Sequence, residues 1–115
     1  MRSPCPGDRE RGTVTAELAV ALPAVLLVLA ACLGALRLGA EQVRIVDAAA
    51  LAARSTARGD APAVSARLAR AAGAERITTT RSADGLVCVV ARRLTPVLGL
   101  ALPLAARSCA LGTTP

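Results

Sequence analysis

Residues 18–36 read LAVALPAVLLVLAACLGAL, a run of 19 residues with no charge and no strongly polar side chain. As a helix rising about 1.5 Å per residue, this run has a length of about 28 Å, close to the thickness of the hydrocarbon core of a bilayer. The alternative is a helix buried in a soluble domain, but the rest of the chain has too little apolar material to surround it. We therefore predict one transmembrane helix, and Pro23 is compatible with it because membrane helices tolerate proline.

The composition of the whole chain excludes several classes of function. Its 115 residues include 14 arginines and 8 acidic residues, a net charge of +6, and they lack lysine, histidine and every aromatic residue. Without histidine there is no Ser-His-Asp triad and no histidine metal ligand, and no C-x-x-C spacing offers a cysteine site. Scattered arginines without aromatic stacking platforms do not predict nucleic-acid binding. We predict a protein that is not an enzyme, with no cofactor, no metal site and no nucleic-acid partner.

The residues before the apolar run form a distinctive junction. Residues 1–12, MRSPCPGDRERG, are polar, carry a net charge of +1 and contain two prolines and two glycines, which predicts a short flexible leader. Gly12 ends this leader, four uncharged residues from Thr13 follow, and Glu17 stands directly before the apolar run. A carboxylate at the edge of a membrane helix is costly unless it is paired, so Glu17 is a candidate functional residue. The alternative is that Glu17 only marks the membrane boundary and offsets the helix dipole.

The sequence resembles the TadE-like minor pilin, or pseudopilin, family of actinobacterial tight-adherence (Tad) pilus systems. The likeness rests mainly on GTVTAELAVALPAVLLVLA at 12–30 and more weakly on DAAALAARSTARGD at 47–60 and a strand-rich tail. It implies cleavage by a prepilin peptidase between Gly12 and Thr13, after which Glu17 pairs with the new α-amine of a neighbouring subunit. Many pilins have an aromatic residue after this glutamate, where this chain has Leu18.

The resemblance also implies a location and partners. The leader 1–12 is expected in the cytoplasm, residues 13–36 in the cell membrane and residues 37–115 as an extracytoplasmic domain. Arginines flank the apolar run on both sides, so charge alone does not decide this orientation. The expected partners are the lipid bilayer, the prepilin peptidase, other pilin-like subunits and the Tad secretion machinery, and the expected role is structural, in pilus assembly or adhesion.

Two other interpretations of the membrane segment stay open. Residues 29–32, Leu-Ala-Ala-Cys, fit a bacterial lipobox, which predicts a surface lipoprotein cut before Cys32. Against it, Glu17 would lie inside the apolar signal region and the run continues past Cys32 to Leu36. The second alternative is an unprocessed single-pass membrane protein of regulatory role, which keeps Met1.

A fold follows from the residues after the apolar run. We expect the helix to continue to about Arg58 and to pack through one stripe of small residues, either on its own domain or on a neighbouring chain. The expected stripe is Val46, Ala50, Ala53 and Ala57, and the expected ladder of exposed charges is Arg37, Glu41, Arg44 and Asp47. A second helix is predicted over 61–72, with Asp60 as its N-cap, Pro62 in its first turn and Gly73 at its end. Its expected buried face is Val64, Leu68 and Ala72.

The remaining residues predict strands. Residues 75–81 are rich in β-branched side chains, residues 82–85 contain the Asp-Gly turn signal, and residues 86–92 form the return strand. Residues 94–104 are apolar but interrupted by proline and glycine, so we expect them to cross over the sheet or touch the membrane surface. Residues 105–111 are a candidate third strand. The predicted class is α+β: a long N-terminal transmembrane helix that continues outside the membrane, a short helix, and a small antiparallel hairpin or three-stranded sheet.

The cysteines fall in three different settings. Cys5 lies in the leader and Cys32 in the apolar run, whereas Cys88 and Cys109 lie in two predicted strands of the outer domain. In facing strands and an oxidising compartment, Cys88 and Cys109 would form a disulfide, which matters because a domain of this size has a small core. The alternative is two buried thiols.

Overall fold

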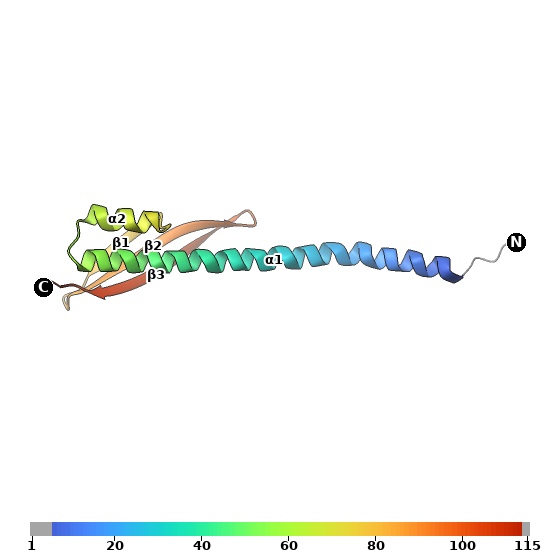
Figure 1. Ribbon diagram of the computed structural model, residues 1–115, viewed down its shortest axis with the longest axis horizontal. Coiled ribbons are helices and arrows are strands. Elements are labelled where there is room, and N and C mark those ends of the chain that lie inside the picture. The colour runs from blue at the N-terminus through green and yellow to red at the C-terminus, as the bar shows by residue number, and fades with distance from the viewer. Residues whose placement is uncertain (1–5, 114–115) are drawn as a thin grey trace. The chain divides into compact units, whose positions relative to one another are not determined.

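The computed structural model describes residues 6–113, and the side chains of residues 12–113. Within that range the elements are α1 (Pro6–Ala57), α2 (Pro62–Ala71), β1 (Arg76–Arg81), β2 (Leu86–Val97) and β3 (Leu100–Leu111) (Figure 1). This arrangement of a long apolar helix, a short helix and an antiparallel sheet confirms the predicted α+β class. The chain divides between Ala35 and Leu36 into two compact units, which are described separately.

The first unit is the N-terminal part of α1. The helix begins at Pro6, so the predicted flexible leader is wrong for residues 6–12, and residues 1–5 with Cys5 lie outside the described residues. Proline suits the first position of a helix because its missing N–H has no partner there, and the arginines and glutamate that follow have high helix propensity. The predicted helix over the apolar run is confirmed, and Pro23 lies inside it.

The second unit is built around a core of small side chains. The three described strands lie in the order β1-β2-β3, and both neighbouring pairs are antiparallel. The sheet packs against the C-terminal half of α1 through Ile45, Val89 and buried alanines of both elements. The buried alanines of the cluster are Ala48, Ala49, Ala52, Ala53, Ala69, Ala74, Ala91 and Ala106. Because alanine has no atoms beyond Cβ, helix and sheet can approach each other closely.

The buried face of α1 differs from the predicted stripe. Ala53 and Ala57 are buried as expected, but Val46 is 46% exposed and Ile45, one position earlier, is fully buried. Alanine stands on every side of this part of the helix, so the apolar periodicity carries too little signal to fix the face. The helix packs on its own domain, which was one of the two alternatives.

The second helix, α2, lies within the predicted range but differs in two details. Ala61 is its N-cap and makes no side-chain bond, so the predicted capping by Asp60 is wrong, whereas Pro62 lies in the first turn as expected. The buried residues of α2 are Ser65 and Ala69, whereas Val64 and Leu68 of the predicted face are exposed. Small side chains again face the core because they allow the closer approach.

The hairpin formed by β2 and β3 is longer than predicted. The turn after β1 and the start of β2 agree with the sequence, but β2 runs on to Val97 and β3 begins at Leu100. The expectation that residues 94–104 cross over the sheet is therefore wrong, because they form strand pairs such as Leu94 with Pro103. Pro96 is tolerated because β1 pairs β2 only as far as Arg92, which leaves that edge of β2 open.

Candidate functional site

The predicted processing and assembly residues all lie on α1. Gly12, Thr13 and Glu17 are exposed, and the Gly12–Thr13 peptide bond is inside the helix. Apart from the adjacent helix backbone, no described atom lies within 4 Å of the place where a Cβ on Gly12 would stand, so tertiary packing does not require glycine there. Thr13 and Glu17 are four residues apart, and a helix brings residues at that spacing to the same face.

The apolar run that follows is exposed throughout. Val20 and Leu27 are 75% and 72% exposed, and no residue of the most apolar 18-residue window is buried within the protein. Within the described residues, α1 is the one helix long and apolar enough to cross a membrane. A soluble core helix would bury this surface, so the exposure is compatible with a single-pass membrane protein.

The cysteine of the alternative cleavage site lies in the same helix. Cys32 is a free, exposed thiol, and α1 continues without a break on both sides of it. Cys32 belongs to the first unit, whereas Cys88 and Cys109 belong to the second.

Cys88 and Cys109 are opposite each other in the register of β2 and β3 and form a disulfide, with an S–S distance of 2.06 Å. Cys88 is buried and Cys109 is exposed, so the bond lies at the edge of the core. It joins two strands that are far from the membrane segment along the chain.

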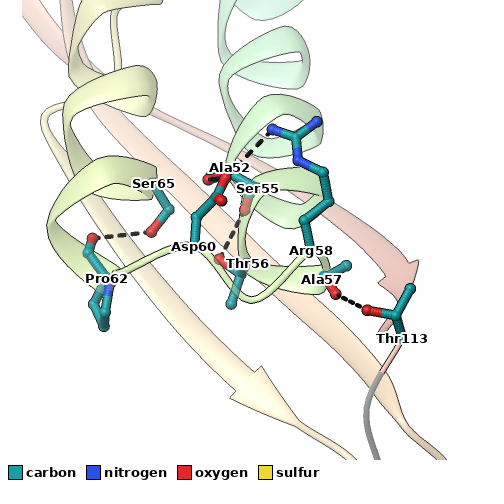
Figure 2. A network of polar contacts seen from close by, with 9 residues as sticks. All are labelled: Ala52, Ser55, Thr56, Ala57, Arg58, Asp60, Pro62, Ser65 and Thr113. Atoms are coloured by element: carbon teal, nitrogen blue, oxygen red, sulfur yellow. Dashed lines mark hydrogen bonds and ion pairs between the residues drawn. The ribbon is translucent and has the colours of Figure 1, made fainter.

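The junction of α1 and α2 is a network of polar contacts (Figure 2). The fully buried Ser55 donates from Oγ to Oδ2 of Asp60 at 2.8 Å, and Arg58 pairs with the same oxygen at 3.4 Å. Ser65 donates to the carbonyl oxygen of Pro62 at 2.9 Å. The hydroxyls of Ser55 and Ser65 therefore form hydrogen bonds at the end of α1 and the start of α2. Asp60 stabilises the connection between the two helices and does not act as the predicted N-cap.

One polar pair in the second unit was missed by the sequence reasoning. Glu41 lies 3.7 Å from Arg44, as expected for the charge ladder, but its closer partner is Arg93 of β2, at 3.1 Å. The neighbouring Gln42 donates from Nε2 to the carbonyl oxygen of Ala105 at 3.3 Å. These contacts join α1 to both strands of the long hairpin. The sequence carries no signal for them because the partners are more than 50 positions apart.

The geometry of this set of residues is suited to association. Among the residues that the structure describes, no three His, Cys, Asp or Glu side chains come together as a metal site would require. The features that stand out are an exposed apolar segment of α1, a carboxylate directly before it, and the disulfide of the second unit, residues 36–115, which we call the outer unit when we discuss its proposed location. No protein-family model, curated protein or solved structure matches the chain.

Proposed function

We propose that this chain is a membrane-anchored, pilin-like structural subunit: a TadE-like minor pilin or pseudopilin of a tight-adherence pilus system. The observation that carries the proposal is Glu17 in the fifth position after Gly12, directly before an apolar run of α1 in which no described residue is buried. In this proposal a prepilin peptidase removes residues 1–12. The processed chain stays anchored in the cell membrane until it joins, or initiates, a pilus-like assembly.

The role of Glu17 follows from the cost of placing a carboxylate beside hydrocarbon. An unpaired charge at this depth is unfavourable, and a cationic partner removes the penalty. Cleavage after Gly12 creates an α-amine on Thr13, about 6 Å along the axis from Glu17 at 1.5 Å per residue. A neighbouring helix displaced by that distance presents its amine to Glu17, so charge pairing sets the axial register between subunits.

The outer unit supports the proposed location. Disulfides persist in oxidising compartments outside the cytoplasm, and Cys88 is bonded to Cys109. If residues 37–115 face outward, the N-terminus faces the cytoplasm, where a leader peptidase can reach Gly12. In this arrangement the outer unit is the part available to the other pilin-like subunits and the secretion machinery.

The first experiment determines the N-terminal residue and the intact mass of the protein purified from the membrane fraction of its host. We expect a chain that starts at Thr13. A chain that starts at a lipidated Cys32 would replace this proposal with a surface lipoprotein, and an intact Met1 would leave an unprocessed single-pass protein.

A pair of glycine variants separates cleavage from folding. Gly12 and Gly39 both lie on α1, and a Cβ on either has open space around it. We expect Gly12→Leu to block cleavage, because a side chain keeps the peptidase from the backbone, and Gly39→Leu to be cleaved normally. Equal processing of the two variants, measured by intact mass, would contradict the assigned cleavage site.

Glu17→Ala tests assembly. We expect this variant to be inserted and cleaved, but to be missing from the filament fraction sheared from the cell surface. Glu41→Ala is not a suitable control because Glu41 pairs with Arg93, so the exposed Asp47 of the same helix is replaced by Ala instead. Normal recovery of Glu17→Ala in the sheared fraction would remove the proposed role of Glu17.

A further inference from the structure

The long hairpin continues past the sheet as a two-stranded ribbon. β1 pairs with β2 only through Arg92, whereas β2 and β3 stay paired to the turn between Val97 and Leu100. We call residues 94–102 the hairpin tip. Ribbons of two strands have little stability of their own in water, so such an extension needs a partner on at least one face.

The hairpin tip is apolar and exposed. Residues 94–106 contain no charged residue. Thr95 is their one residue with a polar side chain, and it is buried. Leu98 and Leu100 are 75% and 68% exposed, and Leu94 is 54% exposed. The register places Leu94 on one face of the ribbon and Leu100 on the other, and exposed leucines on both faces would be an unfavourable surface in water.

The turn of the ribbon keeps a leucine where the backbone disfavours it. Leu98 has φ of 50° and Gly99 has φ of 79°, so both central residues of the turn are left-handed. Asn or Gly is the usual choice at the first of these positions, and a leucine there is strained. A bulky apolar side chain held at a strained, exposed position is a reason to look for a contact that uses it.

Two contacts give the direction of the ribbon within the second unit. Gln42 binds the carbonyl oxygen of Ala105, and Thr113 donates from Oγ1 to the carbonyl oxygen of Ala57 at 3.3 Å. β3 therefore runs from the Leu36 end of this unit toward the end of α1 at Ala57. Because the hairpin tip precedes Ala105 along β3, it lies on the Leu36 side of Gln42.

The length of the ribbon brings the tip to the end of the apolar run. From Ala105 to Leu100 the strand advances about 17 Å, at about 3.3 Å per residue. From Gln42 to Leu36 the helix advances about 9 Å, at about 1.5 Å per residue. Even a strongly tilted ribbon therefore reaches the level of Leu36, where the apolar run of the same chain ends.

The base of the ribbon carries positive charge. Arg76 and Arg92 are direct partners in the register of β1 and β2, both are exposed, and Arg93 follows. With Leu94 and Pro103 these arginines line a hollow of about 530 Å³, to which Glu75 adds the one carboxylate, so three guanidinium groups face one acidic group. An apolar end followed by guanidinium groups matches the order of acyl chains and phosphates at the surface of a bilayer.

We propose that the hairpin tip inserts into the outer interface of the bilayer that the apolar run of α1 spans, with Arg76 and Arg92 against the lipid phosphates. The outer unit is then held on the membrane at two places, the helix and the hairpin tip. This proposal requires only that the apolar run is in a bilayer, and it does not depend on cleavage at Gly12 or on pilus assembly.

The absence of aromatic residues makes a direct test available. In the full chain, Leu100→Trp and Leu111→Trp each introduce the sole tryptophan, at the two ends of β3 and at similar exposure, 68% and 73%. The proteins are reconstituted in phosphatidylcholine vesicles that contain phosphatidylglycerol, with and without bromine on the acyl chains. We expect the tryptophan at 100 to emit at shorter wavelength and to lose most of its intensity in brominated lipid, and the one at 111 to do neither.

Other outcomes are equally clear. The same emission and the same lack of quenching at both positions would overturn the proposal. A tryptophan at 100 that emits at short wavelength without bromine quenching, and only at high protein density, would instead place the hairpin tip against a second copy and also overturn it. Retention of the Cys88–Cys109 bond and of the far-ultraviolet circular dichroism shows that each variant is folded.

A second variant tests the leucine at the turn. Leu98→Asn suits the left-handed backbone and leaves the fold intact, but it removes the most exposed apolar side chain of the hairpin tip. In the Leu100→Trp background we expect it to reduce quenching by brominated lipid. Unchanged quenching would contradict a role for Leu98 in the lipid contact.

Discussion

The two halves of α1 use apolar residues in opposite ways. Residues 18–36 are rich in Leu and Val, and all the large side chains of this run are more than half exposed. Between Ile45 and Ala57 the helix is rich in alanine, and Ala48, Ala49 and Ala52 are fully buried under the sheet. The more apolar half is thus the one that no other described part of this chain covers. Hydrophobicity identifies a segment that avoids water, but the small side chains distinguish the part of the helix that a close-packed sheet covers.

Small and large apolar residues suit these two partners for a physical reason. A bilayer adapts its shape to any apolar surface, so long side chains cost nothing there. A sheet is a rigid partner, and dispersion forces reward the closest approach that the side chains allow. The difference between the two halves of α1 can therefore be tested by substitutions made in pairs, one in each half.

Removing the disulfide should affect only the outer unit. The Cys88–Cys109 bond has a sequence separation of 21, and we expect Cys88→Ala with Cys109→Ala to lower the free energy of unfolding by about 3 kcal/mol. The matched control is Cys32→Ala, which removes the exposed free thiol of the membrane half. Denaturant unfolding in detergent micelles, followed by circular dichroism, measures both, and an equal loss in the control would contradict the separation of the two halves.

An enlarged alanine should be tolerated in one half and not in the other. Ala49→Leu adds three carbons to a fully buried position and should cost about 2 kcal/mol through overpacking. Ala24→Leu makes the same change in the exposed half and should leave the unfolding of the outer unit unchanged. Similar melting temperatures for the two variants would contradict the prediction, because they would show that the interface between α1 and the sheet accommodates a larger side chain.

The charge pair between α1 and the hairpin should contribute less than the alanine packing. Glu41→Gln leaves the guanidinium of Arg93 without its closest carboxylate, and both side chains are partly exposed, so we expect a cost of about 1 kcal/mol. Asp47→Asn removes the same charge from an exposed position on the same helix and serves as the control. The difference in unfolding free energy between the Glu41→Gln and Asp47→Asn variants should shrink at high salt. If Glu41→Gln costs no more than Asp47→Asn, the ion pair does not contribute to stability.

The smallest expected effect is a gain. Leu98→Asn relieves part of the left-handed strain of the turn, a cost of roughly 1 kcal/mol, so the outer unit should become more stable by about 0.5 kcal/mol in detergent. Leu100→Asn, two residues away at an ordinary strand position, should give no gain. Thermal unfolding of the two variants side by side decides whether Leu98 is held against its backbone preference.

The sequence predicted those features whose signals are local. A run of 19 uncharged residues was sufficient for the long helix, the Asp-Gly pair marked the first hairpin turn, and Pro62 marked the start of α2. The extension of the second hairpin was missed because proline normally ends a strand, and only the open edge beside Pro96 makes it acceptable. The predicted face of α1 was correct at Ala53 and Ala57 but misplaced by one residue at Val46, because alanine stands on all sides of the helix.

The candidate site divides in the same way. Gly12 and Glu17 were identified from their spacing along one helix, which a sequence displays directly. The pairing of Glu41 with Arg93 and the strain at Leu98 depend on how distant segments meet and on backbone angles. Neither feature has a local signal in the sequence.

The open edge of β3 has a consequence for handling the protein outside a membrane. Within residues 6–113, β3 has a strand on one side only, so its outward backbone groups, apart from the Ala105 carbonyl that accepts from Gln42, can recruit a strand from another chain. Pro103 offers no N–H and interrupts that row, but the leucines on either side of it are attractive to a second hairpin. A detergent that strips lipid from the hairpin tip should therefore turn this edge into the starting point of β-rich aggregates.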